Sequence, residues 1–396
     1  MSWLEKWIME KIDEIKQKGL YRELREVSSP QRSRIIINGR EVINFSSNNY
    51  LGLASHPEVI KALVNSAEKW GVGSGSARLI VGNHSPHNQL EKYIAEFKEK
   101  EASLVYTSGY HTNVGIITAL MGKEDEIFSD QLNHASIIDG CRLSKAKISI
   151  YRHRDTGHLE ELLSKSRAEK KLIVTDTVFS MDGDLAPLKE IVEIAGRYNA
   201  AVMVDEAHAT GIFGPEGRGL AFHLGLQNEI EIHMGTLGKA VGVSGGYVAG
   251  SKNLINFLIN RSRSFIFTTG YPVPLASAII KAMEIMRKDE RLRKKLWENI
   301  RFFEKRAEEL FKREIHLSSQ IVPVIIGREE TTLKISADLY EKGFFVGAIR
   351  PPTVPPGTSR LRVSLMATHT FEEISDLLES LLSLGKKYGI TLKIGV

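Results

Sequence analysis

Lys239 is the residue of this chain whose surroundings most favour covalent chemistry. It lies in the stretch 235–240, with the sequence GTLGKA, directly after the largely apolar run 230–234. Small neighbours leave room around the amine, and desolvation disfavours its ammonium form, so a lysine in this setting can lose its proton and attack a carbonyl. Thr236, three residues earlier, adds a hydroxyl that could hold a phosphate.

A second apolar run ends in two further groups that could do chemistry. Residues 201–204 are followed by Asp205, Glu206, Ala207 and His208. A lysine and a carboxylate on neighbouring strand ends are the two protein groups that pyridoxal phosphate (PLP) needs. The amine forms a Schiff base, and the carboxylate pairs with the pyridinium nitrogen. The two motifs together therefore predict PLP as the cofactor.

Two nucleotide-binding interpretations of these motifs fail on spacing. The sequence of residues 205–208 also occurs as the acidic box of certain helicases, but those need a GxxxxGK[ST] phosphate loop, which the chain lacks. The glycines of residues 71–76 lie at offsets zero, two and four and follow an expected helix over 57–70, whereas a dinucleotide fingerprint follows a strand. A helicase or a nicotinamide enzyme is therefore not expected.

A catalytic metal is not expected either. The chain has 12 histidines, of which His84 and His87 lie three apart with no cluster of acids nearby. Asp205 and His208 are better explained by their proximity to the lysine motif. Cys141 is the only cysteine, so no intrachain disulfide can form, which is typical of a cytoplasmic protein. We expect Cys141 to be a small buried residue.

Composition excludes other classes. No stretch approaches about 18 uninterrupted apolar residues, and residues 1–7 lack the apolar core of a signal peptide, so neither a membrane span nor secretion is expected. The net charge is +5, with basic and acidic residues mixed. Even the basic run 287–295 contains Asp289 and Glu290, so we expect an exposed helix face and no nucleic-acid partner.

Hydrophobic periodicity predicts an α/β protein in three parts. An amphipathic helix over 2–26 and a hairpin with strands at 34–37 and 42–45 begin the chain. Strands and helices then alternate, which indicates a mostly parallel sheet with helices on both faces. The main expected strands are 103–106, 126–129, 172–175, 201–204, 231–235 and 246–249. A helical region over 275–312 leads into a small α+β lobe. The expected parts are an N-terminal segment (1–45), a large PLP-binding domain (46–290) and a small C-terminal domain (291–396).

Six motifs in the same order resemble the α-oxoamine synthase family of fold-type-I PLP enzymes. The resemblance extends from about residue 20 to the C-terminus, and the set is far more specific than any one motif. It implies a fold-type-I PLP-dependent transferase. The matching stretches are residues 44–53, 130–136, 178–184, 205–208, 235–240 and 358–362.

The resemblance implies roles for five residues around the cofactor ring. Lys239 would carry the Schiff base and later move the α-proton of the substrate. Asp205 would keep the pyridine nitrogen protonated, and His208 would hydrogen-bond the phenolic oxygen. His134 would stack on the ring, and Ser180 would add a polar contact.

The cofactor phosphate has its own expected ligands. Gly109 and Tyr110 follow a strand and should open a helix, where backbone amides suit a phosphate dianion. Thr236 would add its hydroxyl. In the family a partner subunit also reaches the phosphate, which points here to Thr268 and Thr269 and to a homodimer with shared active sites.

The family pattern also indicates a substrate pocket. Arg362 is expected to grip the amino-acid carboxylate, since a guanidinium forms two parallel hydrogen bonds to it. Arg360 lies two residues earlier on the same strand, so the choice between them depends on the resemblance. Asn48, Thr353 and His134 would line the same pocket.

Members of the family condense an amino acid with an acyl-CoA and release CoA, and in the alanine reaction the β-keto acid formed then loses CO2. Residues 349–355 resemble members that join alanine to a pimeloyl thioester, whereas residues 133–140 resemble members that join glycine to acetyl-CoA. We favour alanine because Thr353 is expected near the substrate, while residues after His134 are expected to run along a helix. Glycine with acetyl-CoA stays as the alternative. Outside the family, an aminotransferase would use the same cofactor and fold without CoA.

Overall fold

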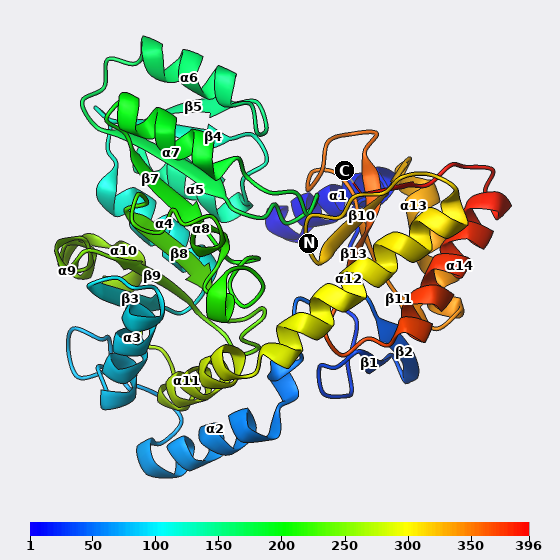
Figure 1. Ribbon diagram of the computed structural model, residues 1–396, viewed down its shortest axis with the longest axis horizontal. Helices are drawn as coiled ribbons and strands as arrows, with labels where there is room; N and C mark the ends of the chain where they lie inside the picture. The colour runs from blue at the N-terminus through cyan, green and yellow to red at the C-terminus, as the bar shows by residue number, and fades with distance from the viewer. Residues whose placement is uncertain (396) are drawn as a thin grey trace. The chain divides into compact units, whose positions relative to one another are not determined.

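The chain forms two compact units in the computed structural model, which describes residues 1–395 (Figure 1). The larger unit contains residues 48–180 and 184–295. The smaller unit contains residues 1–47, the short segment 181–183 and the residues from 296 onward. The N-terminal segment is thus grouped with the C-terminal part of the chain. The division into three parts at residues 45 and 290 stays a prediction.

A seven-stranded sheet with the order β3-β9-β8-β7-β6-β4-β5 forms the centre of the larger unit. β9 is antiparallel to both of its neighbours, and the remaining pairs are parallel. The predicted α/β class with a mostly parallel sheet is confirmed. The edge strand β5 was not predicted. The strands are β3 (Ala102–Tyr106), β4 (Glu126–Asp130), β5 (Lys147–Tyr151), β6 (Lys171–Asp176), β7 (Ala201–Asp205), β8 (Ile232–Thr236) and β9 (Gly246–Gly250).

Helices connect these strands, and several begin at side-chain caps. Ser108 accepts a hydrogen bond from the backbone of His111 at the start of α4, and Asp155 caps α6 in the same way. The helices of this unit are α2 (Pro57–Trp70), α3 (Ser85–Phe97), α4 (Gly109–Leu120), α5 (Ala135–Ser144), α6 (Thr156–Lys165), α7 (Leu188–Arg197), α8 (Leu220–His223), α9 (Lys252–Arg261), α10 (Arg263–Ile266) and α11 (Val273–Lys288).

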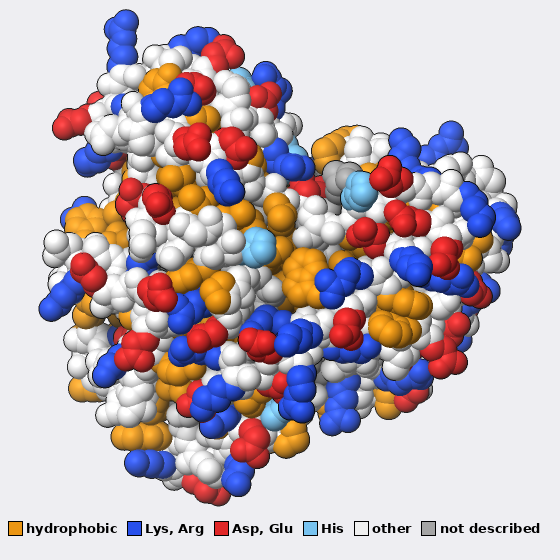
Figure 2. Space-filling model, in the orientation of Figure 1, with side chains coloured by type: hydrophobic (Ala, Val, Ile, Leu, Met, Phe, Trp, Pro, Cys, Tyr) orange, Lys and Arg blue, Asp and Glu red, His pale blue; other side chains and the backbone are white. Residues whose placement is uncertain are grey.

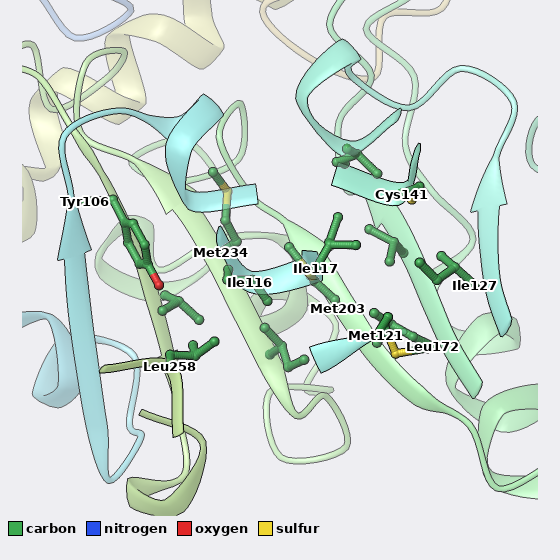
Figure 3. Packing of buried hydrophobic residues seen from close by; sticks show 14 of the residues in the cluster. Tyr106, Ile116, Ile117, Met121, Ile127, Cys141, Leu172, Met203, Met234 and Leu258 are labelled. Atoms are coloured by element: carbon green, nitrogen blue, oxygen red, sulfur yellow. The ribbon is translucent and has the colours of Figure 1, made fainter. Parts of the chain in front are cut away.

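One face of the sheet packs against apolar side chains from α4, α5, α9 and α10 (Figure 3). Alternate strand residues such as Met203 and Met234 point into this layer, next to Ile116 and Cys141. The intervening residues, such as Val202, are also buried. Because successive side chains of a strand point to opposite faces, both faces of the sheet are covered, as predicted. Cys141 is buried as expected, and burial raises the pKa of its thiol to about 12.

The smaller unit contains two sheets, with the orders β1-β2-β11 and β12-β13-β10-β14. The predicted hairpin is confirmed: β1 and β2 are joined by Asn38 and Gly39, both with positive φ. β11 pairs in parallel with β2. The elements are α1 (Trp3–Gln17), β1 (Arg34–Ile37), β2 (Arg40–Asn44), α12 (Glu290–Phe311), β10 (Ile321–Gly327), α13 (Glu329–Glu341), β11 (Phe344–Phe345), β12 (Gly347–Ile349), β13 (Ser359–Ser364), α14 (Phe371–Lys387) and β14 (Lys393–Ile394).

One helix prediction was wrong in its bounds, and one predicted helical region is confirmed as two consecutive helices. The helix expected over 2–26 ends at Gln17, where Gly19 follows in the left-handed region. The helical region expected over 275–312 is two helices, α11 and α12, separated at Asp289, whose ψ of 85° breaks the helix.

Acidic and basic side chains are mixed on the face shown in Figure 2. The basic run 287–295 departs from the prediction at one residue. Arg293 is buried, and its guanidinium donates to the carbonyl of Met286, so the run is not a wholly exposed face. Within residues 1–395, no helix combines the length and the apolar character that crossing a bilayer requires.

Candidate active site

The predicted chemical groups follow strand ends at one edge of the seven-stranded sheet. β7 ends at Asp205, β8 at Thr236 and β6 at Asp176. β3 and β8 are each antiparallel to β9, so they run in the same direction, and α4 starts at this edge as well. In an open α/β sheet, the carboxyl ends of parallel strands are where ligands bind. The motifs therefore meet because the sheet aligns their strands.

Lys239 contacts His208 directly. Its Nζ lies 2.8 Å from Nε2 of His208, and Nδ1 of His208 lies 2.7 Å from the hydroxyl of Tyr50. Tyr50 in turn donates to Oδ1 of Asn48 over 3.0 Å. The structure thus brings together Lys239, His208 and Asn48, three of the predicted site residues. Tyr50 lies inside the matched motif 44–53, but no role was predicted for it.

Asp205 and His134 are connected through Asn113, which the sequence did not single out, and through Ser136 of the matched motif 130–136. Nδ2 of Asn113 donates to Oδ2 of Asp205 over 2.8 Å and to the hydroxyl of Ser136 over 2.9 Å. The hydroxyl of Ser136 lies 2.8 Å from Nδ1 of His134. Asn113 follows Gly109 by four residues, so both lie on the same face of α4. That spacing is the signal from which its position could have been inferred.

A second buried carboxylate lies beside Asp205. Asp176 and Asp205 are partners in the register of β6 and β7, and Oδ2 of Asp176 accepts the backbone N–H of His134 over 2.7 Å. Burial, together with the nearby Asp205, raises the pKa of Asp176 well above its ordinary range. Desolvation lowers the pKa of His134; Asp205 opposes this decrease, and Lys239 adds to it. The imidazole is therefore neutral near physiological pH.

The start of α4 approaches Thr236 closely. A Cβ on Gly109 would lie 2.4 Å from Cγ2 of Thr236, so only glycine fits here. The hydroxyl of Thr236 is buried and has no hydrogen-bond partner within residues 1–395. The first amides of a helix also lack partners inside the helix. The side chain of Tyr110, the second residue of α4, points elsewhere and donates to Oδ2 of Asp139 over 2.7 Å.

Ser180 lies in a turn that a histidine holds to the sheet. The backbone of Phe179 donates to the carbonyl of Asp184, which closes the turn. Nε2 of His153 lies 2.8 Å from Oδ2 of Asp184, and its Nδ1 lies 2.9 Å from Oδ1 of Asp130 at the end of β4. Burial alone would lower the pKa of His153, but its hydrogen bonds to the two carboxylates raise it to about 9. The turn is therefore fixed by a cation between two acids.

The two predicted threonines line a small pocket beside the residues that precede α4. Thr268 and Thr269 line a small pocket with Thr107, which precedes α4, and Thr269 forms an isolated bridge with Ala77. Both therefore belong to the same unit as the residues around Lys239.

Arg362 and Thr353 belong to the smaller unit. Arg362 lies on β13, is buried, and donates from Nη1 to the hydroxyl of Ser364 over 2.7 Å. Arg360, on the same strand, forms an ion pair with Asp182. Thr353 is exposed in the loop between β12 and β13.

A fully buried ion pair is formed by Glu206 of the 205–208 motif and Lys98. Nζ of Lys98, at the end of α3, lies 2.5 Å from Oε2 of Glu206, and neither side chain has any solvent exposure. Lys98 also donates to the carbonyl of Arg218, while Oε1 of Glu206 accepts the backbone N–H of Ala221 over 3.0 Å. The pair thus connects the segment that carries His208 to Arg218 and to the first turn of α8.

Comparison with known proteins agrees with the motifs over almost the whole chain. The family model for aminotransferase class I and II matches residues 40–381. The 8-amino-7-oxononanoate synthase of Thermoanaerobacter pseudethanolicus is 47% identical over 386 residues, which are 97% of this chain and 98% of that protein. The synthase of the same name from Symbiobacterium thermophilum is 46% identical over 389 residues, which are 98% of this chain and 99% of that protein.

Solved structures show the same relationship. A serine palmitoyltransferase variant from S. paucimobilis with a bound PLP–myriocin aldimine has a TM-score of 0.92 at 30% identity, covering 98% of this chain and 100% of that chain. An 8-amino-7-oxononanoate synthase from Francisella tularensis has a TM-score of 0.75 at 29% identity, covering 88% and 99%. Sequence motifs, fold and relatives agree, and the chain belongs to the aminotransferase class I and II family and, within it, to the α-oxoamine synthases.

Proposed function

We propose that the chain binds PLP at the carboxyl edge of its seven-stranded sheet. The observation that carries this proposal is a buried hydroxyl on Thr236 without a partner in the described chain, beside a helix start where Gly109 leaves no room for a side chain. Those features fit a phosphate group. Asp205 ends β7, and Lys239 follows the end of β8 at the same edge of the sheet. The amine of Lys239 fits the aldehyde of the cofactor, and the carboxylate of Asp205 fits its ring nitrogen.

Each of the residues around the cofactor ring then has a defined role. Lys239 would attach the cofactor through Nζ and later accept the α-proton of the substrate. Asp205 would hold a proton on the ring nitrogen, and His208 would contact the phenolic oxygen. His134 would lie against the ring, with Ser180 as a further polar contact. The bound cofactor supplies an electron sink for the pair left on the α-carbon by loss of a proton or of CO2.

The phosphate would be held by the amides of Gly109 and Tyr110 and by the hydroxyl of Thr236. Thr268 and Thr269 would complete this site from the partner subunit of a homodimer. Exposed apolar side chains near these threonines support a subunit contact: Val72, Ile80, Val81 and Phe267 are each at least 70% exposed. Light scattering of the purified protein is expected to give twice the chain mass of 44.3 kDa.

The proposed reaction joins L-alanine to a pimeloyl thioester, giving 8-amino-7-oxononanoate, CO2 and the free thiol, a step of biotin synthesis. Full-length relatives that carry the name of this synthase support it. Residues after His134 form α5, as the choice of alanine over glycine assumed. We place the reaction in the cytoplasm, in keeping with a single buried cysteine.

Arg362 would bind the carboxylate of alanine, and Asn48 and Thr353 are the other proposed substrate residues. Burial of Arg362 supports this role, because a guanidinium removed from water binds a carboxylate more strongly. The choice of Arg362 over Arg360 rests on the family resemblance, since both guanidinium groups lie on β13 and both residues are buried.

The test is release of free thiol by the purified full-length protein. Alanine or glycine is combined with pimeloyl-CoA or acetyl-CoA, and the fastest release is expected for alanine with pimeloyl-CoA. Lys239→Ala should abolish turnover while keeping the fold. Arg362→Ala should raise the KM for alanine, with a loss of about 2–5 kcal/mol in binding. Fastest release with glycine and acetyl-CoA, or amino transfer to a keto acid without thiol release, would contradict the proposal.

A further inference from the structure

Asn113 is a buried amide that holds the carboxylate of Asp205. It is 1% exposed and lies in the second turn of α4. Both hydrogens of its amide nitrogen are used, one on Asp205 and one on Ser136. The other oxygen of Asp205 accepts the backbone N–H of Ala207 over 2.9 Å. Each carboxylate oxygen therefore has one donor, and together these donors fix the orientation of the group.

The direction of the hydrogen bonds from Asn113 determines the tautomer of His134. An amide nitrogen can only donate, so the hydroxyl of Ser136 accepts from Asn113, and its own hydrogen is available for Nδ1 of His134. The backbone N–H of Ser136 also donates to this nitrogen over 3.2 Å. Two donors converge on Nδ1, which must therefore be unprotonated. The neutral imidazole carries its proton on Nε2.

The charged groups around His134 explain why this neutral state is useful. The titratable side chains that face the imidazole are Asp205, Lys239 and Asp139, and the backbone of His134 binds Asp176. An imidazolium would compete for the negative charge of Asp205 and would repel Lys239. When the imidazole of His134 is neutral, the carboxylate of Asp205 stays available to pair with the pyridine nitrogen of the cofactor.

We propose that Asn113 is a positioning residue that orients the carboxylate of Asp205 and, through Ser136, keeps His134 neutral with its proton on Nε2. The role of these groups towards PLP rests on the proposed function. The tautomer of His134 is a property of the chain alone.

The test measures the imidazole by ¹⁵N NMR of histidine-labelled full-length protein, with and without PLP. The His134 signal is identified by its loss in His134→Gln. In the wild type we expect the Nε2–H tautomer. Asn113→Leu frees the hydroxyl of Ser136 to accept from an imidazolium, so the pKa of His134 should rise. The dissociation constant of PLP should rise roughly 10-fold, as expected when a charged acceptor loses one hydrogen bond.

A matched control separates positioning from loss of stability. Asn299 is also buried, also donates two hydrogen bonds from Nδ2, and also has an Oδ1 without a partner within the described residues. It belongs to the smaller unit. Asn299→Leu should therefore lower the urea midpoint about as much as Asn113→Leu, without changing the His134 signal or the affinity for PLP.

Ser136→Ala removes only the connection to His134. It should raise the pKa of His134 and change PLP affinity less than Asn113→Leu does. Combining both substitutions should raise the pKa no further than Asn113→Leu alone. If Asn113→Leu does not fold, the pKa in Ser136→Ala decides, and an unchanged value overturns the proposal.

The proposal is also overturned if Asn113→Leu leaves both the His134 titration and the PLP dissociation constant as in the wild type. Because the NMR measurement needs no substrate, failure of the alanine reaction would leave the positioning role standing. Conversely, if the wild type catalyses the alanine reaction but Asn113→Leu changes neither the His134 titration nor the PLP dissociation constant, only the positioning role is refuted.

Discussion

Replacing Lys98 with methionine should destabilise the folded protein by about 3–5 kcal/mol. Lys98 and Glu206 have no solvent exposure, and their charged atoms lie 2.5 Å apart. Without the ammonium, the carboxylate of Glu206 stays buried beside the backbone N–H of Ala221 and the more distant His233. A methionine fills a similar volume, so the loss comes from the unpaired charge and not from a cavity.

The pKa of Glu206 gives a second measure of the same pair. Burial by itself would raise this pKa, but Lys98 and His233 lower it from 4.5 to about 2. A difference of this size corresponds to about 3 kcal/mol at neutral pH, in agreement with the first value. Because the folded pKa lies below the unfolded one, this stability is present above pH 4.5 and is lost as the pH falls towards 2.

The variant should respond to acid in the opposite sense. Without Lys98, burial raises the pKa of Glu206 above its unfolded value, so the variant gains stability as the pH falls through that raised pKa. The difference between wild type and Lys98→Met should therefore shrink between neutral pH and about pH 5.

Urea unfolding of the cofactor-free chain at both pH values measures this difference. The double variant with Glu206→Gln should recover most of the lost stability, because no charge is then left unpaired. Lys100→Met is the matched control, since Lys100 is a half-buried lysine whose ammonium donates to the carbonyls of Gln227 and Ile230. A Lys98→Met variant as stable as the wild type, or a deficit that does not shrink in acid, would refute the reasoning.

Two further perturbations test other parts of the larger unit. His153→Gln should cost about 2 kcal/mol below pH 6.5, allowing for partial solvent exposure. Because the folded pKa of His153 is raised to about 9, the stability cost of the substitution should disappear as the pH rises through that value. Urea midpoints measured at several pH values test this, and an equal loss of stability below and above pH 9 would contradict the assignment. Thr236→Val replaces a buried hydroxyl that has no partner in the described chain, so the unfolding free energy should stay the same or rise by up to about 1 kcal/mol. The PLP dissociation constant, measured by fluorescence titration, should rise roughly 10-fold, and unchanged affinity would refute the phosphate role of Thr236.

The strands that carry the site could be predicted because their sequence signal is local. The run 201–204 is apolar and ends in Asp205, and the structure has β7 over Ala201–Asp205. β5 escaped prediction because it is an edge strand of mixed exposure, and its sequence therefore contains no continuous apolar run. The end of α1 was missed because apolar residues continue at helical spacing to Leu20, beyond the left-handed Gly19 that follows the helix.

The site residues likewise divide into those that a local sequence motif predicts and those that only the folded chain brings together. Lys239, Asp205 and His208 lie in compact motifs whose chemistry can be read from neighbouring residues. The contacts of Asn113 and Tyr50 could not be derived, because Asn113 meets Asp205 across 92 residues and Tyr50 meets His208 across 158. The spacing of Asn113 from Gly109 places it on one face of α4, but its contact with Asp205, like that of Tyr50 with His208, forms only in the folded chain.

The parallel pairing of β2 with β11 imposes an order on biosynthesis. Arg40, which begins β2, binds Glu341 just before β11, and the two residues are 301 positions apart. At a synthesis rate of about 5–20 residues per second, the ribosome needs roughly 15–60 s to cover that distance. During this interval the nascent hairpin has no third strand, while the whole larger unit emerges and can fold. A chaperone that captures extended apolar segments would therefore find residues 34–44 accessible until translation is nearly finished.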